Sequence, residues 1–82
     1  MARILYFATL VDQLGRASEE LPLPDTVRDV RALVAMLHGR GKNWVTALDE
    51  ATLKVTVNRQ FAELDTPIQD DSEIAFISMR RW

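Results

Sequence analysis

The segment that decides the fold is residues 26–37, Thr-Val-Arg-Asp-Val-Arg-Ala-Leu-Val-Ala-Met-Leu. Its apolar residues recur at intervals of three and four, which places them on one face of an α-helix. Asp25 or Thr26 is expected to accept hydrogen bonds from the free N–H groups of the first turn. Gly39 and Gly41 follow the segment and are expected to end the helix. The apolar positions are Val27, Val30, Leu33, Val34 and Leu37.

Two strands are expected before this helix. Residues 3–8 are β-branched, aromatic and aliphatic, which is typical of a strand. Residues 9–14 form a short helical turn in this interpretation, and Gly15 can end it in the left-handed conformation. Residues 19–23 alternate weakly, and Pro22 cannot donate a ladder hydrogen bond, so this segment is predicted to be an edge strand.

Further strands are expected after the helix. A second, shorter helical piece is predicted at residues 44–48. Residues 53–57 alternate apolar and polar side chains, which indicates a strand with one face on the core. Residues 58–60 are predicted to turn, because Asn58 tolerates the left-handed conformation, and 61–64 to form a short strand. Residues 73–77 are expected to close the sheet.

The order of these elements predicts an α+β fold. One long helix between two groups of strands can cover only one face of the sheet that they form. The leading candidate is a ubiquitin-like β-grasp roll, a mixed sheet with one main helix packed across one face. The 82 residues are expected to make a single domain, 1–82, with no linker or repeat.

The composition argues against several kinds of partner. The net charge is −2 and the isoelectric point is about 5.2, which argues against a nucleic acid or an anionic membrane. No apolar run approaches the ~18 residues of a membrane span. The first residues also lack the apolar core of a signal peptide, so a cytoplasmic protein is expected.

The residue types that carry chemistry are scarce. There is no cysteine, one histidine (His38), and no glycine pattern that would cradle a phosphate. We therefore expect no catalytic residues, no metal, no cofactor and no enzyme activity of the chain by itself. His38 is expected to bond carbonyl groups at the end of its helix, and Trp44 to pack on the core.

Alternation along the first and last strands predicts an apolar patch. If Ile4 and Tyr6 face the core, then Leu5 and Phe7 face the other side of the sheet, together with residues of the closing strand. The residues of this patch are Leu5, Phe7, Ile77 and Met79. Such a patch on a small protein favours a partner surface, and the alternatives are a reversed register or scattered apolar residues without a role.

Three segments together carry a family resemblance. Phe7-Ala8 is followed by Leu10, Leu14 and Gly15; Val57-Asn58-Arg59-Gln60 is followed by Asp65-Thr66-Pro67-Ile68; and Asp71-Ser72-Glu73-Ile74-Ala75-Phe76 opens the last strand. In this order they resemble the MoaD/ThiS sulfur carriers, most closely the small subunit of molybdopterin synthase. The resemblance covers roughly residues 3–77.

The resemblance implies a role in molybdenum cofactor (molybdopterin) biosynthesis. The small subunit of that family is a carrier that docks on a larger catalytic subunit, and an adenylating enzyme activates its tail. Family members typically end in Gly-Gly, whereas the 82 residues end in Ser78-Met79-Arg80-Arg81-Trp82. Glycine permits the close approach that tail activation needs, so sulfur transfer by this chain is in question.

The last three residues leave several interpretations open. They could be a solvated terminus, a tail that contacts a partner or a second copy of the chain, or an altered form of a longer tail. The rival function is a ubiquitin-like interaction or regulatory module, which could pair with itself as a homodimer. The predicted partner-binding residues are Leu5, Phe7, Ile77, Met79, Arg80, Arg81 and Trp82.

Overall fold

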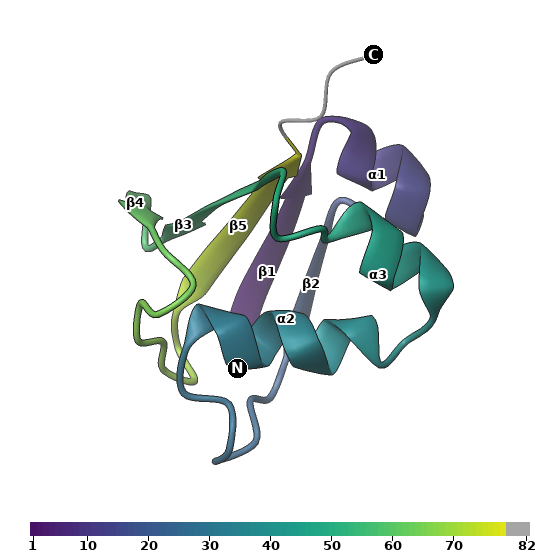
Figure 1. Ribbon diagram of the computed structural model, residues 1–82. Helices are drawn as coiled ribbons and strands as arrows, with labels where there is room; N and C mark the ends of the chain where they lie inside the picture. The colour runs from purple at the N-terminus through teal and green to yellow at the C-terminus, as the bar shows by residue number, and fades with distance from the viewer. Residues whose placement is uncertain (79–82) are drawn as a thin grey trace.

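A five-stranded sheet forms one layer of the structure, and helices pack against it (Figure 1). The computed structural model describes residues 1–78. The longest helix, α2, crosses one face of the sheet, and α1 and α3 lie near one end of it. The elements are β1 (Ala2–Phe7), α1 (Thr9–Leu14), β2 (Ser18–Leu21), α2 (Val30–His38), α3 (Lys42–Ala47), β3 (Leu53–Val57), β4 (Gln60–Ala62) and β5 (Glu73–Ser78).

The strand order is β2-β1-β5-β3-β4. The two central strands, β1 and β5, are parallel, and all other pairs are antiparallel. This mixed sheet with its main helix across one face confirms the predicted α+β β-grasp roll. The strand predicted to lie at an edge of the sheet is β2, and it is an edge strand. Pro22 follows its last residue.

The core lies between the sheet and the helices. Alternation along β1 is as predicted, with Ile4 and Tyr6 buried while Arg3 and Phe7 are exposed. The buried side chains opposite them belong mainly to α2, which faces the sheet with the apolar side that its sequence predicts. The largest fully buried side chains are Tyr6, Phe76, Ile4, Leu10, Leu33, Leu37, Leu48, Ile74, Val30 and Val34.

The helix α2 begins later than predicted. Its N-cap is Asp29, whose carboxylate accepts from the Ala32 N–H at 2.8 Å. The N–H groups of Val30 and Arg31 donate instead to carbonyls of the segment before β5, at 3.1 and 2.8 Å. The prediction that Asp25 or Thr26 caps this helix is therefore wrong, because backbone partners distant in the sequence decide where its first turn forms.

Two short connections follow the predicted turn chemistry. Gly15 ends α1 in the left-handed conformation, with φ of 75°, and donates to the Val11 carbonyl. Asn58 and Arg59 both have positive φ between β3 and β4, at 51° and 70°, which suits a tight hairpin turn. Gln60, predicted to lie in that turn, is instead the first residue of β4. Within residues 1–78, no helix has the length and apolar character to cross a bilayer.

Replacing Asp29 with alanine should remove the cap of α2. We expect the free energy of unfolding to fall by about 1 kcal/mol, since one first-turn N–H group loses its acceptor. Urea unfolding followed by circular dichroism measures the change. Asp25→Ala is the matched control, because Asp25 does not cap the helix. An equal loss of stability in both variants would contradict the assignment of the cap.

Replacing Ala8 with glycine should stabilise the fold. Ala8 joins β1 to α1 with φ of 58° and ψ of −133°, a region that strains a residue carrying a Cβ atom. Relief of about 1–3 kcal/mol of strain outweighs the entropic cost of glycine, about 0.5–1 kcal/mol. Urea midpoints should therefore rise for Ala8→Gly and fall for the control Ala17→Gly, whose φ is not positive.

A candidate docking surface on the open sheet face

The candidate site is the sheet face that no described helix covers. The β1–β5 register places Leu5 beside Ala75 and Phe7 beside Ile77. The row of paired residues continues across β3 and β4, because Thr56 of β3 pairs with Ala75 on one side and with Phe61 of β4 on the other. Side chains at paired positions lie on the same face of a sheet. We call the apolar side chains of this face the open-face patch: Leu5, Phe7, Phe61, Ala75 and Ile77.

The patch is a surface rather than a buried layer. Phe7 is 46% exposed and Phe61 is 84% exposed, while Leu5 and Ile77 are half-buried. Ala75 is buried, since its small side chain lies between neighbours on β1 and β3. Large aromatic side chains exposed to this degree lose unfavourable contact with water when a partner covers them.

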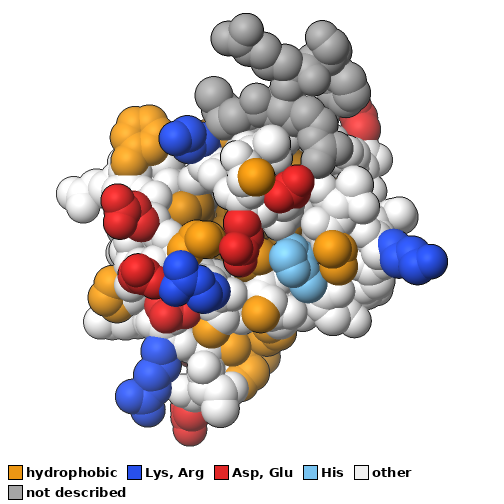
Figure 2. Space-filling view, viewed as in Figure 1, with side chains coloured by type: hydrophobic (Ala, Val, Ile, Leu, Met, Phe, Trp, Pro, Cys, Tyr) orange, Lys and Arg blue, Asp and Glu red, His pale blue; other side chains and the backbone are white. Residues whose placement is uncertain are grey.

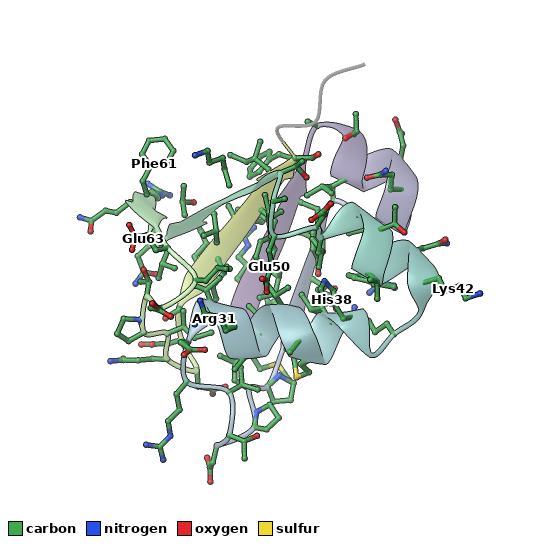
Figure 3. The ribbon with its side chains drawn as sticks, viewed as in Figure 1. Arg31, His38, Lys42, Glu50, Phe61 and Glu63 are labelled. Carbon is green, nitrogen blue, oxygen red and sulfur yellow. The ribbon has the colours of Figure 1, made fainter. Side chains whose placement is uncertain are left out.

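The sequence analysis missed Phe61. Figure 3 shows its ring standing out at the edge of the sheet on β4. The side-chain alternation of β3 could have located it, because a two-residue turn at Asn58 and Arg59 makes Gln60 the partner of Val57 and Phe61 the partner of Thr56. The sequence predicted a three-residue turn instead, which left the facing of Phe61 undetermined.

The structure brings together three of the predicted partner-binding residues. Leu5, Phe7 and Ile77 lie on adjacent strands of the same face. Their role in binding a partner stays a prediction. Met79, Arg80, Arg81 and Trp82 lie outside the described residues.

A polar cluster on the helix-bearing side of the sheet was also missed. Its centre is the Glu19 carboxylate on β2, which accepts from the Tyr6 hydroxyl at 2.7 Å. The Arg40 guanidinium donates to both carboxylate oxygens, at 2.8 and 2.9 Å, and lies 4.6 Å from the ring centroid of Trp44. Arg16 donates to the same carboxylate at 3.3 Å. Trp44 packs on the core as predicted, and its ring makes a T-shaped contact with the ring of Tyr6.

The protonation of this cluster follows from its contacts. Burial alone would raise the pKa of Glu19, but the hydrogen bonds from Arg40 and Tyr6 and the nearby positive charges lower it below its ordinary value of 4.5. Burial, reinforced by the hydrogen bond to Glu19, raises the pKa of the Tyr6 hydroxyl. Glu19 is therefore ionised near neutral pH, and Tyr6 keeps the proton that it donates.

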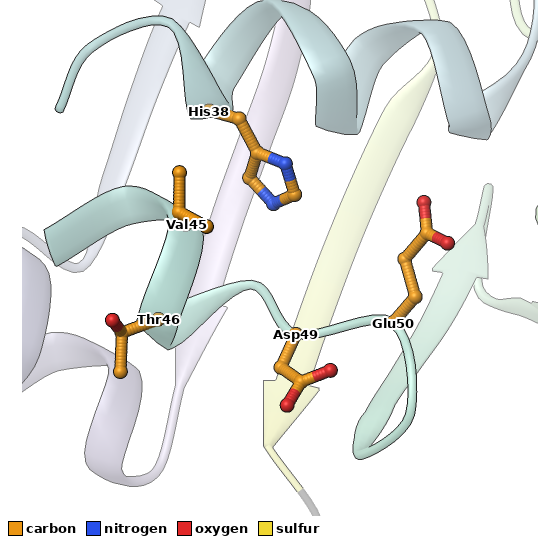
Figure 4. A pocket seen from close by; sticks show the side chains of 5 residues that line it. All are labelled: His38, Val45, Thr46, Asp49 and Glu50. Atoms are coloured by element: carbon orange, nitrogen blue, oxygen red, sulfur yellow. The ribbon is translucent and has the colours of Figure 1, made fainter. Parts of the chain in front are cut away.

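An open groove lies beside the single histidine (Figure 4). His38, Val45, Thr46, Asp49 and Glu50 line it, and the histidine reaches the surface beside acidic side chains (Figure 2). His38 Nε2 lies 2.8 Å from the Leu48 carbonyl and donates to it, since a carbonyl only accepts. The prediction that His38 bonds the carbonyls at the end of its own helix is therefore wrong, because the acceptor is the C-cap residue of α3. No group of three or more potential metal ligands occurs among residues 1–78.

A comparison with protein families matches residues 4–79 to the ThiS family. The chain belongs to the ThiS family. The molybdopterin synthase sulfur carrier subunit of Haemophilus influenzae is 28% identical over 76 residues, which are 93% of this chain and 91% of that protein. That relative is named as a sulfur carrier subunit, which agrees with the role that the resemblance implied.

Solved structures support the same fold. A putative molybdopterin converting factor, subunit 1, from Pyrococcus furiosus superposes with a TM-score of 0.75 at 23% identity, covering 94% of each chain. Small archaeal modifier protein 1 from Haloferax volcanii has a TM-score of 0.71 at 18% identity, covering 94% of this chain and 92% of that one. These likenesses confirm the ubiquitin-like β-grasp fold.

Acid should weaken the fold through Glu19. A carboxyl group whose pKa is lowered on folding stabilises the protein above its ordinary pKa of 4.5, and this contribution is lost as pH falls below it. We expect Glu19→Gln to reduce the free energy of unfolding by about 1–3 kcal/mol at pH 7. We also expect the free energy of unfolding of this variant to fall less steeply than that of the unmodified chain as the pH is lowered. Urea unfolding between about pH 7 and pH 3 measures both effects.

Glu20→Gln is the matched control for this prediction. Glu20 follows Glu19 on the same strand, points to the opposite face and is exposed. The Glu20→Gln variant should have nearly the same free energy of unfolding at pH 7 as the unmodified chain. Equal pH profiles for Glu19→Gln and the unmodified chain would contradict the stabilising role of the cluster.

Proposed function

We propose that this chain is a MoaD-like small protein of molybdenum cofactor biosynthesis that docks on a larger protein subunit. The proposed partner resembles the large subunit of molybdopterin synthase. The family membership and the Haemophilus influenzae relative support this assignment. The observation that carries the docking mode is the open-face patch, where Leu5, Phe7 and Ile77 lie side by side with aromatic rings exposed.

The position of the patch suits a carrier. Ile77 belongs to the patch, and Ser78, the next residue, ends β5. The end of β5 therefore lies beside the proposed docking surface, so a partner bound there lies next to the end of the last strand. An adenylating enzyme is a second proposed partner, acting on the C-terminal segment before the large subunit uses it.

The chemistry of the described residues favours a carrier over a catalyst. They include no thiol, and the one histidine donates to a backbone carbonyl. In this proposal the larger subunit supplies the catalytic groups, and this chain supplies a docking surface and a tail. We further propose that it acts as a single β-grasp domain in the cytoplasm.

Phe7→Asp and Leu5→Asp should abolish binding to the large molybdopterin synthase subunit of the same organism. Each places an ionised carboxylate in the proposed interface. Docking would remove the water that hydrates this carboxylate, which is unfavourable. Phe61→Ala should weaken binding by about 30-fold, the effect of losing a well-packed aromatic contact. Isothermal titration calorimetry with the purified subunit measures these affinities.

Val45→Asp is the matched control. Val45 is 49% exposed, similar to Phe7, but it lies on α3 and lines the groove beside His38. It should bind like the unmodified chain. Circular dichroism checks that each variant is folded. Undiminished affinity of Phe7→Asp would show that the open-face patch is not the docking surface.

A further inference from the structure

We propose that the partner presents a carboxylate side chain, from Asp or Glu, to Lys54 when it covers the open-face patch. This inference rests on the proposed docking function and specifies the chemistry of the partner surface. It starts from the distribution of charge over the open face, which differs between the two ends of the strands.

Lys54 lies at the end of the patch where β5 ends. The β3–β5 register pairs it with Ile77, and the β1–β5 register pairs Ile77 with Phe7. The row across these strands is therefore Lys54, Ile77 and Phe7. Lys54 is exposed, and its ammonium group makes no hydrogen bond or ion pair with any residue of the described range 1–78.

The opposite end of the face carries charges of both signs. Arg3 is paired in register with Glu20 on one side and with Glu73 on the other. Glu73 also lies 3.9 Å from the Arg59 guanidinium, measured from carboxylate oxygen to Nε. Two basic and two acidic side chains thus alternate along this end. In the row of Lys54 the nearest acidic residue is Glu63, which follows β4 and would lie opposite Lys54 if the β3–β4 register continued by one residue, and no ion pair joins the two side chains.

A partner that covers the patch also covers Lys54. Thr56 pairs with Phe61, and Lys54 lies two residues from Thr56 on the same face of β3. Lys54 is therefore diagonal to Phe61 and directly beside Ile77. A surface that contacts both Phe61 and Phe7 must cross β3 between them, where Lys54 stands.

Covering an ammonium group without compensation is unfavourable. The group loses water, and apolar side chains such as Ile77 and Phe7 cannot replace those hydrogen bonds. A carboxylate on the partner restores a charge-assisted hydrogen bond and also fixes the orientation of docking. An uncharged or basic partner surface at this position would oppose binding. The charge of Lys54 thus selects a partner with an acidic side chain near the end of β5.

The test is calorimetric titration of the 82-residue chain against the purified large molybdopterin synthase subunit of the same organism. Lys54→Met keeps most of the apolar stem and removes the charge, and we expect binding about 10-fold weaker. Lys54→Glu should bind at least about 100-fold more weakly, because it places a carboxylate next to the proposed carboxylate of the partner. The affinity of the unmodified chain should fall between about 50 and 500 mM NaCl, and that of Lys54→Met should fall less.

Lys42→Met is the matched control. Lys42 lies on α3, far across the view from the edge that carries Phe61 (Figure 3). It should match the unmodified chain at every salt concentration. If the unmodified chain binds and Phe7→Asp does not, while Lys54→Met binds as tightly as the unmodified chain or more tightly, the docking function stands and the carboxylate contact is wrong. If the unmodified chain does not bind the subunit, both proposals are wrong.

Discussion

The parallel pairing of β1 with β5 is the constraint on which the rest of the structure depends. It joins the first strand to the last, in the centre of the sheet. The same register buries Ile4 with Ile74 and Tyr6 with Phe76, and aligns the apolar residues of the opposite face. A shift of one residue would exchange the two faces. The core and the open-face patch are therefore products of one pairing.

The helix-bearing side is held by contacts of a different kind. Glu19 joins β2 to Tyr6 of β1 and to Arg40, which follows α2, while Arg40 also covers the ring of Trp44 on α3. Three donors satisfy one carboxylate that is only 12% exposed. Because this cluster, α2 and the core occupy one side, the other side of the sheet is left to apolar and charged surface residues. The asymmetry of the two faces is what leaves the candidate docking surface uncovered by the described helices.

Family membership and geometry lead to compatible conclusions about function. The ThiS family match spans residues 4–79, nearly the whole described structure. Its relatives include a protein named as a sulfur carrier subunit. The geometry adds a physical description: an apolar centre, a row of charges of both signs at one end and, at the other, a lysine without an ion pair to residues 1–78. In the proposed docking function, these features define the shape and charge that the surface of the partner has to match.

The sequence by itself determined the class of fold and much of the facing of its strands. Periodicities of two and 3.6 residues depend only on local geometry, so they predicted β3 and the apolar side of α2 correctly. Only the tertiary structure decided the start of α2, where distant carbonyls bind its first N–H groups. It also decided the contacts of Glu19 and the facing of Phe61, because strand pairing and side chains remote in the sequence determine them.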